Sequence, residues 1–485
     1  MNLHRPISPA EMVCNHVFRV ELSSRMDPKR IRNRSLPFVL VGALAVFLGN
    51  LSFFPTLLRA QEALRYAAVE TVDPSSAIAP EQSTDLSSDL NPPLPVAPTD
   101  SVNARVDPAR VDSGIPRRFH YELRLNIHSV YDDNINISQG VRESDFYTAI
   151  EPSITLAFGD IVSREANFLA LNYLASLFLF ADHSENNALQ HVFQLESQYQ
   201  MNRLTLNLTQ SIQILDGTDI RSLNSGGDFS QQVNLDVAGR TRFNIYTTHA
   251  NAAYYLTGKT SLSVGGDYTA SDYQSLISSS TISGNLFLNY NYGPKLVVGL
   301  GGTFGSNIVD SPTPDQTFEQ VNARFTYQLT GKIDVRASAG VEFREFEGAG
   351  RDRYTSPVFD IGLNYLPFDG TTLSLTANRR MLNSAVLAGQ DFATTNFTAN
   401  VQQRMFNRVY LGVGVGYENS DYFSAVAAAG SGRTDNYFFV EPSITVRVTR
   451  FWSVGAYYLH RANDSSLEVF GFHDNQVGFR TSLTF

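Results

Sequence analysis

Cysteine, tryptophan and charged residues are scarce in this chain of 485 residues. It has one cysteine, Cys14, and one tryptophan, and charged residues make up 17% of the sequence, against roughly 25% in ordinary soluble domains. Because Cys14 lies in a segment that we expect to be removed, the mature protein can form neither a disulfide nor a thiolate–metal site. The formal net charge of −10 favours no nucleic-acid partner. We expect no cofactor and no bound metal ion.

Long apolar runs are also rare, and the main one lies near the N-terminus. Met26 begins a basic stretch, and an apolar run follows over Leu36–Leu58. This order is typical of an export signal. We therefore expect Met26 to be the true start, Ala60 to lie at the cleavage site, and residues 1–60 to be absent from the mature protein. A retained transmembrane helix is the alternative, since the run is just long enough to span a bilayer.

Aromatic residues are missing after Tyr66 in the segment that follows the signal. Residues 61–116 hold eight of the chain's 20 prolines, set among serine and aspartate. Such a composition cannot bury enough apolar surface to offset the entropy lost on ordering. The sequence therefore predicts a disordered periplasmic arm. It acts either as a passive spacer or as a binding segment for a periplasmic partner.

The remaining residues, 117–485, alternate between apolar and polar side chains, and Thr317–Phe346 illustrates the pattern. Its apolar register is Val321, Ala323, Phe325, Tyr327 and Leu329, continued after a short turn by Ile333, Val335, Ala337, Ala339, Val341 and Phe343. Side chains alternate across a strand, so each half of this segment has one apolar and one polar face. Gly331 supplies the backbone freedom that a tight hairpin turn requires. The segment is predicted to be a β-hairpin.

The length of each strand indicates which solvent its faces meet. The alternation persists for roughly twice the five or six residues of a typical soluble strand and matches the 9–11 residues of a membrane-spanning strand. The polar register carries full charges and is expected to face a wet lumen. These lumen-facing candidates are Arg324, Asp334, Arg336, Glu342 and Arg344. They form either a cationic strip that guides anionic solutes or a ladder of mixed sign. A large soluble β-sandwich is the alternative fold.

Short turns alternate with long polar loops along residues 117–485. Counting them predicts an all-β, antiparallel, up-and-down transmembrane β-barrel of about 18 strands, with both chain ends on the short-turn side. Phe229–Val237 alternates by itself, and we assign it to a long loop rather than to an extra hairpin. Glycines 412, 414 and 416 are expected to face inward and leave space in the lumen. The predicted location is the outer membrane of a Gram-negative bacterium.

A cluster of polar residues follows the first predicted strand. It reads Tyr131-Asp132-Asp133-Asn134, and Ser144-Asp145 and a strand with Pro152 come after it. This opening resembles the β-barrel porin 2 family, outer-membrane barrels associated with exopolysaccharide and capsule operons, and the resemblance extends over residues 117–485. It implies a barrel that works with periplasmic polysaccharide export proteins, and it implies no catalytic residues. A similar run over Tyr437–Thr445 suggests a duplicated hairpin.

The opening motif allows two chemical interpretations. Asp132, Asp133 and Asn134 supply clustered oxygens that suit Ca²⁺ or sugar hydroxyls. Aspartate and asparagine also favour turns and cap strand ends, which is the more ordinary role. An aspartate-based barrel protease that also uses His473 and Asp474 lacks a supporting spacing.

Two functions are consistent with these patterns. The first is a channel for exopolysaccharide export, as the family resemblance implies. The alternative is a general or substrate-selective diffusion porin for small polar solutes, a class that usually folds one long loop inward. In either case the expected partners are outer-membrane lipid, the barrel-assembly machinery, and polysaccharide or small polar solutes. We expect no enzymatic activity.

The last strand ends on an aromatic residue and generates the first prediction. Phe479, Leu483 and Phe485 lie on one face, as in the terminal strand that the assembly machinery recognises in bacterial outer-membrane barrels. Deleting Phe485 should lower the amount of assembled barrel and raise degradation, as measured by heat-modifiable mobility in outer-membrane fractions. Deleting a residue from the polar loop 347–351 is the control. Normal assembly without Phe485 would count against this role.

Overall fold

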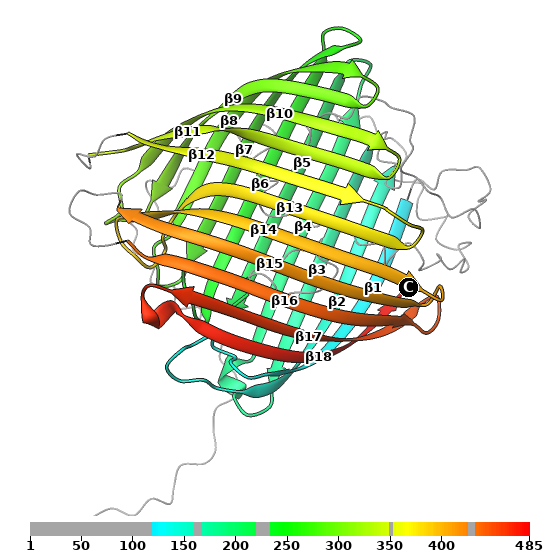
Figure 1. Ribbon diagram of the computed structural model, residues 1–485, viewed down its shortest axis with the longest axis vertical. Coiled ribbons are helices and arrows are strands. Elements are labelled where there is room, and N and C mark those ends of the chain that lie inside the picture. The colour runs from blue at the N-terminus through cyan, green and yellow to red at the C-terminus, as the bar shows by residue number, and fades with distance from the viewer. Residues whose placement is uncertain (1–118, 160–166, 220–232, 349–352, 425–431) are drawn as a thin grey trace, which may run out of the picture. The chain divides into compact units, whose positions relative to one another are not determined.

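The computed structural model describes residues 119–159, 167–219, 233–348, 353–424 and 432–485. Almost all of them are β-structure, drawn in Figure 1. The strands are β1 (Phe119–Asp132), β2 (Asp145–Gly159), β3 (Phe168–Phe180), β4 (Ala188–Gln200), β5 (Leu204–Gly217), β6 (Thr241–Tyr255), β7 (Thr260–Tyr273), β8 (Ser279–Gly293), β9 (Leu296–Val309), β10 (Gln316–Thr330), β11 (Ile333–Phe346), β12 (Tyr354–Tyr365), β13 (Thr371–Asn383), β14 (Gln390–Met405), β15 (Val409–Ser424), β16 (Thr434–Arg447), β17 (Trp452–Ser465) and β18 (Phe472–Thr484). Two 3₁₀ turns, η5 (Ser184–Asn186) and η6 (Glu468–Phe470), lie in loops.

The strands form one closed sheet in which every neighbour in sequence pairs antiparallel. β1 pairs with β2 on one side and with β18 on the other, so that the sheet closes on itself. Phe485 completes the closure: its N–H donates to the Leu123 carbonyl at 2.8 Å, and the Leu123 N–H donates back at 3.0 Å. The predicted 18-stranded antiparallel barrel is confirmed.

Two predictions concern residues outside the described part of the chain. The export signal over residues 1–60 and the proline-rich arm over 61–116 both precede Phe119, where the first described strand begins. No helix among the described residues is long and apolar enough to cross a membrane.

The two faces of the β10–β11 hairpin meet different surroundings. Phe325 is 41% exposed on one face, whereas its neighbour Arg324 is 4% exposed on the other. Exposed large apolar side chains recur along the outward faces of the other strands, for example Leu300 on β9 and Val413 on β15. Because an apolar outer band needs a lipid solvent, this arrangement matches a membrane-spanning barrel with a polar interior.

The inward-facing glycines of β15 do not leave empty space in the lumen. A Cβ atom at Gly416 would lie 2.1 Å from the Phe439 ring, and one at Gly412 would lie 2.6 Å from Ser443 Oγ. Side chains of β16 therefore lie across these glycines and fill the positions that a longer residue would take. The expectation of open lumen space beside Gly412 and Gly416 is wrong, because glycine here admits a neighbouring side chain.

Phe229–Val237, for which an extra hairpin was the alternative to a loop, forms no strand in its described part. Residues 233–240 run as a turn with a single bridge between Asp219 and Val233, while residues 229–232 lie outside the described part. The strand before it, β5, pairs directly with β6. The segment from 233 onward is therefore a loop, as predicted.

The parity of the β10–β11 hairpin generates the second prediction. Arginine in place of Phe325 or Ala337 should cost about 2–4 kcal/mol near the bilayer midplane and lower the amount of folded barrel. Arginine in place of Thr326 or Ser338, one residue away on the opposite face, should permit insertion. Folding into lipid vesicles, followed by electrophoretic mobility, measures all four variants. Equal tolerance at every position would refute the assignment of faces.

Candidate functional site: the inner closure of the barrel

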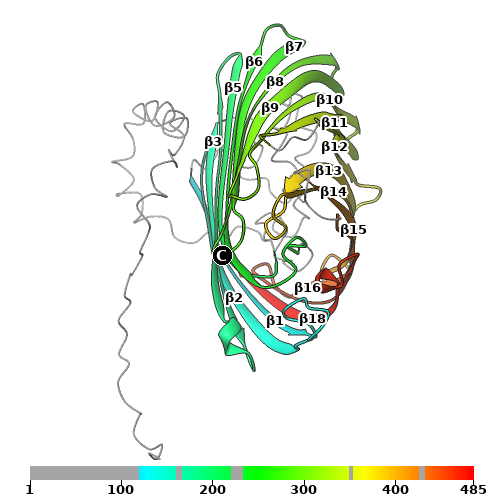
Figure 2. The same ribbon diagram turned by 90° about the vertical axis from the view of Figure 1, so that its left-hand side faces the viewer.

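The loop between β5 and β6 folds into the barrel and binds the inner wall. Figure 2 shows it, in green, inside the ring of strands. Val233 and Leu235 are buried in an apolar cluster with interior residues of β1, β16, β17 and β18. The wall residues of this cluster are Val130, Tyr437, Phe439, Tyr457, Leu459 and Phe472, joined by Ile137 from the β1–β2 loop. Burial of these side chains stabilises the loop in its inward position, because apolar area leaves water.

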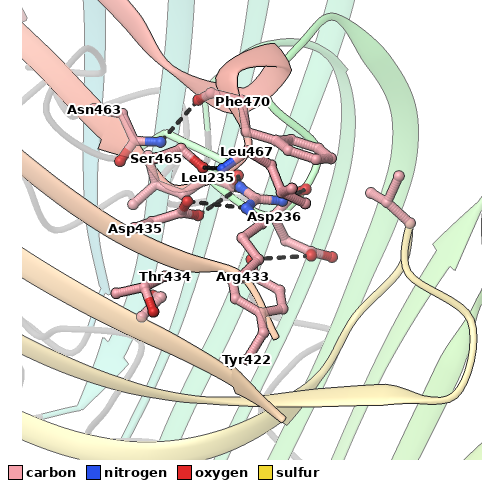
Figure 3. A network of polar contacts seen from close by, with 12 residues as sticks. Leu235, Asp236, Tyr422, Arg433, Thr434, Asp435, Asn463, Ser465, Leu467 and Phe470 are labelled. Carbon is pink, nitrogen blue, oxygen red and sulfur yellow. Dashed lines mark hydrogen bonds and ion pairs between the residues drawn. The ribbon is translucent and has the colours of Figure 1, made fainter. Parts of the chain in front are cut away.

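Arg433, just before β16, fixes the backbone of this loop (Figure 3). Its Nη1 donates to the Asp236 carbonyl at 3.0 Å and its Nη2 to the Leu235 carbonyl at 2.6 Å. The same guanidinium pairs with Asp435 and lies over the Phe470 ring, 3.5 Å from its centroid. Arg433 is fully buried, so these contacts replace the water that a guanidinium normally binds. It acts as a clamp on the loop.

The carboxylate of Asp236 joins the loop to two other elements. Ser384 Oγ donates to Asp236 Oδ1 at 2.7 Å, the Ala385 N–H donates to Oδ2 at 2.6 Å, and the Tyr422 hydroxyl donates to Oδ1 at 3.1 Å. Burial raises the pKa of the Asp236 carboxyl above its usual value of 3.8, although these donors and the Arg433 charge favour the ionised form. Asp236 therefore links the β5–β6 loop, the β13–β14 turn and β15.

The start of the loop is held by a second buried arginine. Arg461 on β17 pairs with Asp474 of β18 and with Asp219, which it meets at 2.8 Å. Asp219 in turn forms the bridge to Val233. Arg461 thus fixes the start of the β5–β6 loop at Asp219, and Arg433 fixes its later part at Leu235 and Asp236.

The turn between β13 and β14 also points into the barrel, as Figure 2 shows in yellow. The Ala385 N–H contacts Asp236, and the carbonyl of the same residue accepts from the Ile277 N–H at 2.9 Å. The Gly389 N–H donates to Thr313 Oγ1 at 2.9 Å. This turn therefore touches three long loops, those after β5, β7 and β9. Together, loop 233–240 and turn 384–389 form what we call the inner closure.

The predicted lumen-facing charges lie on the inner face of the wall with different partners. Arg344 pairs with Glu342 at 2.7 Å and with Asp391 at 3.3 Å, and all three are buried. Arg336 lies 3.3 Å from Asp334, with its side chain 48% exposed. Among these four strand residues and Asp391 the pattern is a ladder of mixed sign rather than a cationic strip.

Arg324 differs from the other predicted charges. Its Nε donates to Asn289 Oδ1 at 3.0 Å and its guanidinium lies 3.9 Å from the centroid of the Phe287 ring. Within the described residues its two terminal nitrogens have no hydrogen-bond partner and it forms no ion pair. It is therefore a cation whose charge no carboxylate of the described wall offsets.

The opening motif forms a tight structural turn beside β18. Asp132 accepts from the Asn134 N–H at 2.7 Å and from Gln476 Nε2 at 2.9 Å. The Asp133 carboxylate accepts two hydrogen bonds from Asn475, one from the backbone N–H and one from the side-chain amide of Asn475. Asn134 is fully buried and donates to the His473 carbonyl at 2.8 Å. Tyr131 lies on the exposed outer face. These are the contacts of a turn and a strand-end cap.

Three acidic groups, on Asp132, Asp133 and Asp474, do approach one another at this turn, with ligand atoms within 4.8 Å. Their oxygens accept hydrogen bonds from Gln476 and Asn475, and Arg461 pairs with Asp474. His473, the base of the conceivable protease arrangement, is exposed, while Asp474 is buried on the opposite face of β18. The arrangement is therefore that of a connected turn and not of a catalytic pair.

The residues of the inner closure were not singled out from sequence. Asp236, Ser384 and Arg433 lie in or beside polar loops, where aspartate, serine and arginine are ordinary. The available signal was indirect, namely the alternation in Phe229–Val237, whose apolar members Val233 and Leu235 are too hydrophobic for a solvated loop.

The comparisons with known proteins agree with this architecture. Residues 315–485 match the family model described as putative beta-barrel porin 2, which confirms the family resemblance over that part of the chain. The matched part contains the run at Tyr437–Thr445 and leaves out the opening motif at Tyr131–Asn134. No curated protein matches the chain.

A search of solved structures finds several matches to this chain. OpdK of Pseudomonas aeruginosa with vanillate is 11% identical, with 75% of this chain and 99% of that chain covered and a TM-score of 0.41. OccK2 (OpdF) of Pseudomonas aeruginosa is 10% identical, with coverages of 76% and 97% and a TM-score of 0.41. OccAB3 of Acinetobacter baumannii is 10% identical, with coverages of 75% and 99% and a TM-score of 0.40.

The closed sheet, its apolar outer band and the family match define the class. The protein is a porin-like β-barrel of the outer membrane of a Gram-negative bacterium. Its surroundings are membrane lipid on the outside and solutes in the lumen.

The buried carboxyl of Asp236 generates the third prediction. A carboxyl whose pKa is raised in the docked loop binds protons more strongly there than in a released loop, so docking is favoured as the pH falls. The conductance of the channel in planar bilayers should therefore decrease on acidification between the raised pKa and the usual value of 3.8.

Asp236→Asn is the matched control for this pH response. It keeps the size of the side chain and removes the titrating group, so the variant should lose the part of the response that belongs to the loop. An unchanged pH response in Asp236→Asn would show that other groups cause it.

Proposed function

We propose that the protein is a diffusion channel for small polar solutes rather than an enzyme. The observation that carries this proposal is the inward loop 233–240, which Arg433 and Asp236 hold against the inner wall. A barrel of this strand number encloses an aqueous channel, and a loop fixed inside it narrows that channel. A narrowed channel admits small molecules and excludes chains, as a diffusion porin does.

Arg324 supports a preference for anionic solutes. Its guanidinium has no ion pair among the described residues and lies on the inner wall beside Asn289. A fixed cation in a narrow, low-dielectric channel attracts a passing anion more strongly than it does in bulk water.

Polysaccharide export is the second candidate, and the family match over residues 315–485 favours it. An exported polymer needs a continuous path as wide as its chain, so export requires the inner closure to move aside. Periplasmic export proteins are the partners that this function would require.

Solute size separates the two functions and provides the fourth prediction. Vesicles that contain the purified barrel should swell rapidly in monosaccharides and small carboxylates and slowly or not at all in long glucan chains. Equal rates for glucan chains and monosaccharides would favour export, and no swelling with any solute would refute a channel.

The same vesicles test the role of Arg324. Arg324→Gln should shift the reversal potential in a salt gradient towards cation preference, because it removes a fixed positive charge. Asn322→Gln, two residues away on the same inner face, is the matched control and should leave the potential unchanged. An unchanged potential in both variants would remove the argument for anions.

A further inference from the structure

The barrel wall has a seam at its long-loop end, where the neighbouring strands β12 and β13 part. β12 pairs with β11 as far as Tyr354, but its pairing with β13 ends at Phe359 and Arg379. β13 itself remains paired with β14 up to Asn383. Each strand therefore keeps one neighbour at its long-loop end and loses the other. The seam is a separation of β12 from β13, not a frayed end.

Backbone parity shows which groups face the seam. The Leu366 N–H donates to the Lys332 carbonyl at 2.8 Å, so even-numbered residues of this strand direct their backbone groups to β11. Odd-numbered residues of β12 accordingly face β13. The Arg404 N–H donates to the Gly370 carbonyl at 2.7 Å, so odd-numbered residues of β13 face β12.

A proline stands at the first lost hydrogen-bonded position. Continuing the register beyond Phe359 and Arg379 would place Pro357 opposite Met381. Proline has no N–H to donate there, and the Met381 carbonyl instead accepts from Arg344 Nη2 at 3.4 Å. The sequence thus weakens the ladder at this point and provides another donor for the carbonyl that it frees.

Beyond the seam the wall overlaps itself. Asp391 of β14 lies in register with Phe423, on the outer face of β13–β15, yet it accepts from two inward-facing residues of β10 and β11. Gln316 Nε2 lies 2.9 Å from Asp391 Oδ1, and Arg344 Nη1 lies 3.3 Å from Oδ2. Tyr354 of β12 stacks on Phe423, with ring centroids 4.2 Å apart and planes at 11°. The outer face of one part of the wall therefore packs on the inner face of the next.

The tucked part of the wall also supports the inner closure. On its inner side Phe392 stacks on Tyr422 at 4.7 Å, and Tyr422 and Ser384 donate to Asp236. We call residues 380–392 the flap. Moving the flap outward would break the contacts of Ser384 and Ala385 to Asp236 and so remove one attachment of the β5–β6 loop.

We propose that the flap is the gate of this channel, with a tucked, closed state and an open state in which β13 pairs with residues 354–358 of β12. This regulation rests on the proposed channel function. Two states exist because each satisfies different groups: the closed state satisfies Asp391, Arg344 and Gln316, and the open state extends the backbone ladder. Opening widens the long-loop end of the lumen.

Cysteine cross-linking at the seam tests the open state. In the open register Val358 would lie opposite Arg380 as a non-hydrogen-bonded pair, whose Cα atoms are about 4.5 Å apart and suit a disulfide. We would introduce Val358→Cys with Arg380→Cys in a Cys14→Ser background. Asp360→Cys with Asn378→Cys, which are already paired in the closed structure, is the matched control.

Oxidation should cross-link the control pair rapidly in outer membranes and the seam pair slowly. Asp391→Asn removes a charged acceptor of the closed state and should speed cross-linking of the seam pair by about tenfold or more. The oxidised seam pair should conduct more than the reduced one in planar bilayers, and dithiothreitol should reverse the increase.

Three results would overturn the gate. The first is a seam pair that stays reduced in Asp391→Asn while the control pair oxidises. The second is equal conductance of the oxidised and reduced seam pair, and the third is equal cross-linking rates with and without Asp391→Asn. A cross-linked barrel that conducts in neither state would instead refute the channel function itself. The two proposals therefore fail separately.

Discussion

The structure depends on one constraint, that no backbone hydrogen-bonding group inside a bilayer can remain without a partner. Hydrocarbon offers no hydrogen bonds, so each unpaired N–H or carbonyl costs several kcal/mol. A sheet meets this condition only by closing, and here β1 pairs with β18 while the terminal residue Phe485 extends the pairing to Leu123. The alternation along each strand follows from the same closure, since one face then meets lipid and the other the lumen.

The long-loop end relaxes this constraint because it lies inside the overlap of the wall. Where β12 and β13 part, the freed Met381 carbonyl accepts from Arg344, and Asp391 accepts from Gln316. Side chains thus replace the backbone ladder at the seam between β12 and β13. These side-chain contacts involve only a few residues, so the tucked and the strand-paired arrangements of the flap can compete.

The sequence predicted what depends on period and count. Alternation over residues 117–485 gave the strand number, the faces of the β10–β11 hairpin and the loop character of 233–237, because these features depend on neighbours along the chain. It gave the wrong account of Gly412 and Gly416, since what covers an inward glycine depends on the adjacent strand. The contacts of Asp236 with Ser384 and Arg433 span 148 and 197 positions. No local pattern could indicate them, because each residue alone is an ordinary loop residue.

The clamp formed by Arg433 also has a consequence for the order of assembly. Loop 233–240 follows β5, yet the arginine that clamps its backbone lies just before β16. The arginine clamp on the loop therefore cannot form until more than 190 further residues have entered the sheet. Contacts of such long sequence separation form late. A docked loop thus reports a completed barrel, and a stalled intermediate would leave its lumen unobstructed.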